Sequence, residues 1–234
     1  MTEKTPLALL PGLLLNEGLW APLALALSAR ATVHVADFTT QDSVAEMARS
    51  VLEAMPPRFA LAGLSMGGYV ALEIMRQAPE RVIRLALLDT QARADSDTVR
   101  QRRLALIEMA KMGKFKGVTP RLLPMLIHKD RLADATVTGP ILDMAEMIGR
   151  DAFFRQQNAI LTRPDSRQDL VRITCPTLVL CGRQDALTPL ARHTEMAAGI
   201  SNSRLKIIEN CGHIPPLERP AETLAELQSW LSYS

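Results

Sequence analysis

Ser65 is the residue of this sequence whose surroundings most directly suggest chemistry. It lies in the motif G-L-S-M-G at 63–67, between an apolar run typical of a strand at 58–64 and a helical pattern that follows. Such a turn holds a serine in a strained backbone conformation with its hydroxyl exposed, and small residues leave room for the strand and the helix. A serine that only caps the helix is the simpler alternative. The strand, turn and helix around the motif favour a nucleophile.

A serine hydroxyl is a weak nucleophile at neutral pH, so a base must accept its proton. Of the four histidines, His34 falls in a strand pattern, His128 in a helical insertion and His193 in a helix. For these three we expect surface or core roles. His213 lies in the loop N-C-G-H-I-P-P, directly after a predicted strand. Sites in parallel sheets form in the loops at the carboxyl ends of the strands, so His213 is predicted to be the base.

Two aspartates at the same predicted edge could orient the histidine and stabilise its charged form. Asp185 lies in G-R-Q-D-A-L-T-P after one strand, and Asp89 ends another. Both keep the chain order serine, aspartate, histidine, so position alone does not separate them. Asp37 precedes the serine and is disfavoured by that order.

An oxyanion that forms during acyl transfer needs two hydrogen-bond donors. The backbone N–H of Met66, the residue after the serine, is expected to be one of them. The other is expected in the loop L-L-P-G-L-L-L-N-E-G-L-W after the first strand, where Gly12 permits a close approach of the backbone. The N–H of Leu13 is the natural second donor. Without Ser65 and His213, an ordinary Pro-Gly turn would be the better interpretation.

The pattern of apolar residues predicts an α/β protein with a parallel sheet and helices on both faces. Strands are predicted near 6–10, 31–36, 58–64, 82–88, 176–181 and 204–208, and helices near 19–29, 43–55, 67–78, 189–199 and 218–232. The alternation breaks from 92 to 172, where helical periodicity continues. We expect 1–91 and 173–234 to form the core and 92–172 to form a helical cap over the carboxyl edge of the sheet.

Five of the eleven methionines fall in this predicted cap, together with two phenylalanines. These residues could line an apolar, deformable pocket, or they could form the internal packing of the cap, which is the expectation for most of them. They are Met109, Met112, Met125, Met144, Met147, Phe153 and Phe154.

The overall composition is that of an ordinary globular protein. Apolar residues make up 47% and charged residues 22% of the 234 positions, and the net charge of +2 does not indicate a nucleic-acid partner. The three cysteines have no C-x-x-C spacing and are too few for a disulfide framework. We therefore predict no metal and no cofactor.

The apolar run near the N-terminus is broken by Pro11 and Gly12, so a signal peptide is not expected. No apolar run reaches the roughly 18 residues of a membrane span. These observations favour a cytoplasmic protein that acts on a small molecule, without a nucleic-acid or membrane partner. They do not indicate an oligomeric state.

Taken together, the motifs resemble the α/β-hydrolase superfamily over residues 6–232. The matching segments are G-L-S-M-G-G for the nucleophile elbow, G-R-Q-D-A-L-T-P for the acid loop, G-H-I-P-P-L-E-R-P for the histidine loop and P-G-L-L-L-N-E-G-L-W for the oxyanion loop. The resemblance implies that Ser65 is the nucleophile, His213 the base and Asp185, rather than Asp89, the acid. It also implies a compact sheet of six strands, because the first two strands of the full family sheet are missing. Many relatives have His-Gly at 11–12, so a polar side chain often found beside the oxyanion loop is absent here.

The serine also narrows the reaction that this resemblance implies. Relatives that open epoxides or carbon–halogen bonds use an aspartate at this position, so Ser65 points to acyl chemistry. The sequence is most similar to small-substrate carboxylesterases, including methyl esterases, and to enol-lactone hydrolases. Carbon–carbon bond hydrolases and cofactor-free perhydrolases share the layout and are the alternative. A protein that binds a small ligand without turnover is a further alternative, because a fold does not guarantee a function.

Overall fold

The structure is a computed structural model of the chain and describes residues 4–232. Six parallel strands form one sheet in the order β2-β1-β3-β4-β5-β6. They are β1 (Thr5–Leu10), β2 (Ala31–Val35), β3 (Phe59–Leu64), β4 (Val82–Leu88), β5 (Thr177–Gly182) and β6 (Ser203–Ile208). Each lies within one residue of its predicted bounds, and the predicted six-stranded parallel sheet is confirmed.

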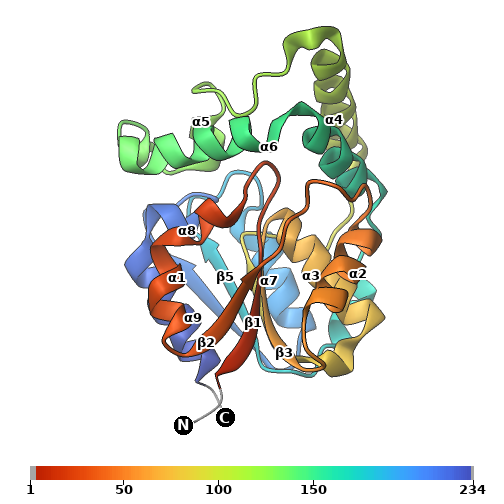
Figure 1. Cartoon of the computed structure of the whole chain (residues 1–234), viewed down its shortest axis with the longest axis vertical. Coiled ribbons are helices and arrows are strands. Elements are labelled where there is room, and N and C mark those ends of the chain that lie inside the picture. The colour runs from red at the N-terminus through yellow and green to blue at the C-terminus, as the bar shows by residue number, and fades with distance from the viewer. Residues whose placement is uncertain (1–3, 233–234) are drawn as a thin grey trace.

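Helices cover both faces of this sheet (Figure 1). One face carries α1 (Ala21–Ser28), α8 (Pro215–Glu218) and α9 (Pro220–Leu231), and the other carries α2 (Val44–Ala54), α3 (Met66–Gln77) and α7 (Leu190–Gly199). Successive side chains of a strand point to opposite faces. In β1, accordingly, Leu7 and Leu9 pack in the cluster with α1, whereas Ala8 and Leu10 pack in the cluster with α2 and α3. Each layer of helices therefore has its own hydrophobic core.

The strand order changes direction at the pair formed by β1 and β3. The chain runs from β1 outward to β2, returns to the other side of β1 as β3, and then continues outward through β4, β5 and β6. The loops after β1 and β3 therefore lie where the strand order reverses, at the carboxyl ends of these two strands. Ligand sites of open parallel sheets form at such a point.

Between β4 and β5 the chain leaves the sheet and builds a layer over the carboxyl ends of the strands (Figure 1). This cap contains α4 (Asp97–Met109), α5 (Leu123–Leu126) and α6 (Ala135–Thr162). Short helical turns complete the chain at Glu17–Leu19, Pro79–Arg81, Ala110–Lys114, Lys129–Arg131 and Arg167–Arg172. Among residues 4–232, no helix is long and apolar enough to cross a membrane.

The longest cap helix, α6, has two halves with different surroundings. Gly149 divides it with φ 75° and ψ 178°, a backbone conformation that is essentially limited to glycine. After this kink, Ala159 and Ile160 pack into the same cluster as α2 and α3. The helix α4, by contrast, has no buried residue. The boundaries predicted for core and cap stay a prediction.

Candidate active site

Ser65 stands in the sharp turn between β3 and α3. Its φ of 55° lies in the left-handed region, which a residue other than glycine adopts only under strain. The backbone is held there because the Ser65 N–H donates to the Leu88 carbonyl at 3.0 Å, and the hydroxyl of Thr90 donates to the Ser65 carbonyl at 2.8 Å. The serine side chain makes no capping hydrogen bond to α3. A role as helix cap is therefore not supported, and the hydroxyl is free for other partners.

The glycines of the motif are required by the close approach of strand and helix. A Cβ atom at Gly67 would overlap the backbone carbonyl of Leu10 at the end of β1, and one at Gly63 would overlap the backbone of Gly67. Neither obstacle is a flexible side chain that could move aside. The elbow therefore needs residues without side chains at both positions.

The structure brings Ser65, His213 and Asp185 together in one hydrogen-bonded chain. His213 Nε2 lies 2.9 Å from Ser65 Oγ, and His213 Nδ1 lies 2.8 Å from Asp185 Oδ2. Both His213 and Asp185 are buried, with 3% and 5% of their surface exposed. The three residues come from the loops after β3, β6 and β5, at the carboxyl edge of the sheet.

Asp185 is held as a carboxylate by several donors. Its Oδ1 accepts the N–H groups of Leu187 at 2.8 Å and Thr188 at 3.0 Å, and its Oδ2 accepts the Thr188 hydroxyl. Burial alone would raise the pKa of this carboxyl. The neighbouring His213 and the hydrogen bonds from Thr188 outweigh burial and hold the Asp185 pKa well below its usual range. A carboxylate fixed in this way can orient the imidazole and stabilise its charged form.

Asp89, the other acid at this edge, lies beside Asp185 in a different environment. It is fully buried, and its Oδ1 accepts the Gly182 N–H at 2.9 Å. Burial, followed by the negative charge of Asp185, raises the pKa of Asp89 well above its usual value. Two carboxyl groups this close cannot both ionise readily. The environment therefore favours a protonated Asp89 beside an ionised Asp185.

His193 completes this buried group at the start of α7. It is fully buried, and its Nε2 accepts the Thr90 N–H at 3.1 Å, so the ring carries its proton on Nδ1. Burial lowers the pKa of His193 to about 4, which keeps the ring neutral near pH 7. Asp89, Asp185 and His193 offer possible ligand atoms within 4.8 Å of one another. Hydrogen bonds already occupy Asp185 and the Nε2 of His193, so we assign no metal to them.

The two predicted oxyanion donors lie next to Ser65. Met66 is the first residue of α3, where a backbone N–H has no partner within the helix. Leu13 follows Gly12, at which an added Cβ would lie 3.3 Å from the Ser65 Cβ. Within the described part of the chain, neither the Met66 N–H nor the Leu13 N–H donates to a protein acceptor. Their role as oxyanion donors stays a prediction.

The oxyanion loop is held by a residue of the cap that the sequence analysis missed. Gln156 lies in the second half of α6 and is 1% exposed, and its Oε1 accepts the Leu14 N–H at 3.0 Å. Its Nε2 donates to the Phe38 carbonyl at 3.1 Å. Gln156 thus supplies a polar contact to a loop that lacks the histidine found in many relatives.

Glu218 has a corresponding role at the histidine loop and was also missed. This fully buried carboxylate accepts the N–H groups of Gly212 at 2.9 Å, Ile214 at 3.0 Å and His128 at 2.7 Å. The His213 N–H donates to the Leu126 carbonyl of the cap at 2.8 Å. The histidine is therefore fixed by its own loop and by the cap. One signal in the sequence could have identified Glu218, namely its position within the segment G-H-I-P-P-L-E-R-P of the histidine loop.

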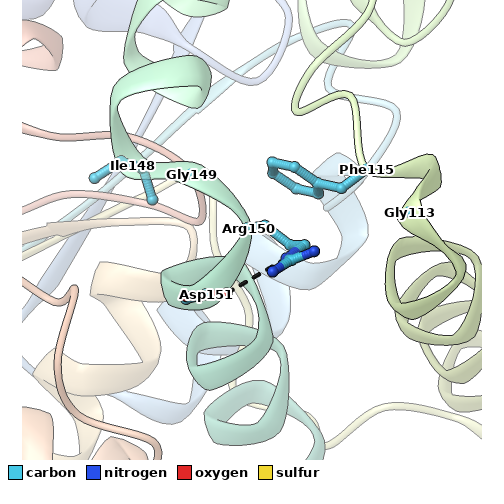
Figure 2. Close-up of a pocket in the computed structure, with 6 residues that line it drawn as sticks. All are labelled: Gly113, Phe115, Ile148, Gly149, Arg150 and Asp151. Atoms are coloured by element: carbon cyan, nitrogen blue, oxygen red, sulfur yellow. Dashed lines mark hydrogen bonds and ion pairs between the residues drawn. The ribbon is translucent and has the colours of Figure 1, made fainter.

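A cavity of about 440 Å³ opens in the cap between the end of α4 and the kink of α6. Figure 2 shows the Phe115 ring and the Arg150 guanidinium facing each other across it, with Arg150 paired to Asp151. The lining residues are Gly113, Phe115, Ile148, Gly149, Arg150 and Asp151. No methionine is among them. Met112 and Met147 are instead 63% and 73% exposed, whereas Met144 is buried in packing.

Comparison with known proteins identifies the family. A sequence model of the alpha/beta hydrolase family matches residues 7–227, and the chain belongs to this family. The chain is 27% identical to the pimeloyl-(acyl-carrier protein) methyl ester esterase of Nitrosomonas europaea, over 92% of this chain and 91% of that protein. The predicted superfamily and fold are confirmed.

Two solved structures are similar over nearly the whole chain. A thermophilic esterase from Thermogutta terrifontis superimposes with a TM-score of 0.87 at 27% identity, covering 97% of this chain and 89% of that one. The enol-lactonase of Burkholderia xenovorans has a TM-score of 0.89 at 24% identity, covering 99% and 93%. The second likeness shows a shared fold.

Proposed function

We propose that this protein is a serine hydrolase that cleaves a small carboxylic ester or lactone through an acyl-enzyme intermediate. The observation that carries the proposal is the chain of contacts from Ser65 Oγ to His213 Nε2 at 2.9 Å and from His213 Nδ1 to Asp185 Oδ2 at 2.8 Å. A nucleophile within reach of a base, which is itself oriented by a third group, is the arrangement required for acyl transfer. Relatives named as esterases support hydrolysis of an ester-like substrate.

In the first half of the reaction, His213 Nε2 accepts the Ser65 proton while Oγ bonds to the carbonyl carbon. The carbonyl oxygen becomes an oxyanion that accepts hydrogen bonds from the N–H groups of Leu13 and Met66. The intermediate then collapses as the bond to the leaving oxygen breaks, and the imidazolium returns its proton to the departing alkoxide. Asp185 orients His213 and stabilises its charge throughout.

In the second half, a water molecule takes the place of the alcohol. His213 accepts a proton from the water, which attacks the carbonyl of the acyl-enzyme, and the same two N–H groups bind the new oxyanion. The bond to Ser65 Oγ breaks, and His213 returns the proton to the serine. The product is a carboxylic acid, or a hydroxy acid if the substrate was a lactone.

The proposal is tested with Ser65→Ala and His213→Ala against a panel of p-nitrophenyl esters. Each variant should lose at least about 10³ in kcat, because removal of a member of such a triad leaves only binding and oxyanion stabilisation. Fluorophosphonate should label the wild type and leave Ser65→Ala unlabelled. Full activity in either variant would contradict the assignment.

A second panel separates the candidate substrates. Esters, lactones and diketones offered to the wild type should show turnover of the first two classes. Preferential cleavage of the diketones would favour a carbon–carbon bond hydrolase with the same catalytic residues. Saturable ligand binding without an acyl-enzyme burst would indicate a binding protein. Burst kinetics with an activated ester distinguish these outcomes.

A further inference from the structure

Gln156 is a buried polar side chain that joins the cap to the oxyanion loop. Both ends of its amide have backbone partners: Oε1 accepts the Leu14 N–H at 3.0 Å, and Nε2 donates to the Phe38 carbonyl at 3.1 Å. These partners fix the orientation of the amide, because the reverse orientation would set a donor against the Leu14 N–H and an acceptor against the carbonyl. The sequence separation of 142 residues between Leu14 and Gln156 makes this a contact of tertiary structure alone.

The turn at 12–15 explains why Leu14 needs such a partner. The Leu15 N–H donates to the Gly12 carbonyl at 3.1 Å, and Leu14, the third residue, has φ 58°. A positive φ at this position belongs to a type II turn and favours glycine or asparagine, so a leucine is strained there. A type I turn keeps the same hydrogen bond with a negative φ at this position. The two types differ by a flip of the middle peptide, the one that contains the Leu14 N–H.

The hydrogen bond from the Leu14 N–H to Gln156 therefore opposes the peptide flip that would relieve the backbone strain at Leu14. A flip changes the backbone torsions on both sides of the Leu13–Leu14 peptide, directly beside the Leu13 N–H. Displacement of a catalytic group by about 1 Å can cost about 10²-fold in rate. The geometry of the proposed oxyanion donor thus depends on a side chain that does not touch the reacting atoms.

We propose that Gln156 is a positioning residue of the oxyanion hole, which holds the turn at 12–15 in the form that directs the Leu13 N–H to the oxyanion. This inference rests on the proposed function, since it assigns a role within the same site. Gln156 belongs to the second half of α6, so the oxyanion hole is complete only when this half of the helix is packed on the core.

Neighbouring side chains on α6 provide a matched control. Arg155 Nε donates to the Thr39 carbonyl at 2.7 Å, and Asn158 Nδ2 donates to the Asp42 carbonyl at 3.1 Å. These bonds anchor the same helical turn to the loop after β2 but do not reach the oxyanion loop. Removal of one of these two hydrogen bonds weakens the packing of the cap on the core but keeps the hydrogen bond between Leu14 and Gln156.

The experiment compares Gln156→Met, Gln156→Glu and Asn158→Leu with the wild type. The methionine has a similar shape without hydrogen-bonding groups, whereas the glutamate keeps an acceptor for the Leu14 N–H and loses the donor to Phe38. We measure kcat and KM for a p-nitrophenyl ester, with active sites counted by fluorophosphonate labelling. Affinity for a boronic acid, whose tetrahedral serine adduct mimics the intermediate, is measured in parallel, and thermal unfolding reports the folded state of each variant.

For Gln156→Met we expect kcat to fall about 10²-fold with little change in KM, and affinity for the boronic acid to fall in parallel, as for the loss of an oxyanion donor. Gln156→Glu should keep more activity than Gln156→Met, and Asn158→Leu should stay within about threefold of the wild type.

Two results would overturn the inference while the wild type remains active. One is a Gln156→Met variant with the same kcat as Asn158→Leu. The other is a Gln156→Glu variant that is as impaired as Gln156→Met, or more, because a residue that only docks the cap would suffer most from a carboxylate facing the Phe38 carbonyl. A wild type that neither hydrolyses esters nor reacts with fluorophosphonate would instead contradict the proposed function.

Discussion

The edge of the sheet and the cap above it are built in opposite ways. At the edge, polar and charged groups are almost completely buried, with Asp89, His193 and Glu218 each at 0% exposure, and hydrogen bonds hold them in place. In the cap, α4 buries no residue, and large apolar side chains such as Met112 and Met147 face solvent. Proton transfer and oxyanion stabilisation require fixed groups in a dry environment. The contrast teaches that the proposed catalytic groups lie in the tightly bonded edge of the sheet, and that hydrogen bonds of Gln156 and Glu218 connect this edge to the cap.

The largest effect is expected from substitutions that test whether Asp185 or Asp89 is the charged acid at the edge of the sheet. Asp185→Asn should lower kcat by about 10⁴-fold, because an amide cannot hold His213 in the required tautomer. Asp89→Asn should change kcat by less than about tenfold, since asparagine resembles the protonated carboxyl that burial favours at this position. Steady-state kinetics with one p-nitrophenyl ester measure both. A larger loss in Asp89→Asn would exchange the roles of the two acids.

The next test makes the same substitution in both regions. Gly67→Ala should destabilise the protein by about 4 kcal/mol, because its Cβ would overlap the Leu10 carbonyl. Gly139→Ala, within α6 and with no heavy atom within 4 Å of its Cβ, should stabilise it by about 0.5 kcal/mol through helix propensity. Urea unfolding gives both values. Equal effects would show that the elbow is not the more tightly constrained region.

His193 provides a test of the buried edge against pH. Its pKa is lowered from 6.5 in the unfolded chain to about 4, so the folded protein binds fewer protons between these values and loses stability as pH falls through this window. The loss should amount to about 3 kcal/mol. In His193→Gln, which keeps an acceptor for the Thr90 N–H, this loss should be absent. Unfolding free energies at neutral pH and near pH 4 measure the difference, and parallel pH profiles for both proteins would contradict the prediction.

The smallest effect is expected on the surface of the cap. Met147→Ala should change the free energy of unfolding by less than about 0.5 kcal/mol, because the side chain is 73% exposed. Met196→Ala, at 0% exposure in the core, should cost about 3 kcal/mol. Thermal unfolding of the two variants compares the regions directly. A marked loss of stability in Met147→Ala would reveal packing that solvent exposure does not indicate.

The strands and the group of Ser65, Asp185 and His213 could be predicted from sequence because their signals are local. Strand-like apolar runs alternate with helical patterns along the chain, and Ser65, Asp185 and His213 each follow a strand within a short motif. The parallel order of the strands then brings these loops to one edge. Local patterns of this kind can be recognised without knowledge of the tertiary structure.

Other features could not be predicted because they depend on contacts between distant segments. Gln156 meets Leu14 across 142 residues, and nothing in its own helical segment indicates a buried acceptor. Position left Asp89 and Asp185 equivalent, and only the family resemblance favoured Asp185. In the structure, the contact with His213 and the donors around Asp185 distinguish the two acids. The exposure of the cap methionines likewise depends on which face of a helix packs on the core, since Met144 is buried and Met147 is exposed in the same half of α6.

The kink at Gly149 places the cavity and the contact of Gln156 on different turns of α6, which bears on how this protein can be redesigned. After the kink, α6 carries Gln156, whose side chain bonds to the Leu14 N–H and the Phe38 carbonyl, so its substitution is expected to reduce turnover. The cavity is lined at the kink itself by Ile148, Gly149, Arg150 and Asp151, and the exposed helix α4 ends shortly before the lining residues Gly113 and Phe115; none of these residues supplies a proposed catalytic group. A mutant library aimed at new substrates should therefore keep Gln156 and vary the cavity-lining side chains of Phe115, Ile148, Arg150 and Asp151 together with exposed positions of α4.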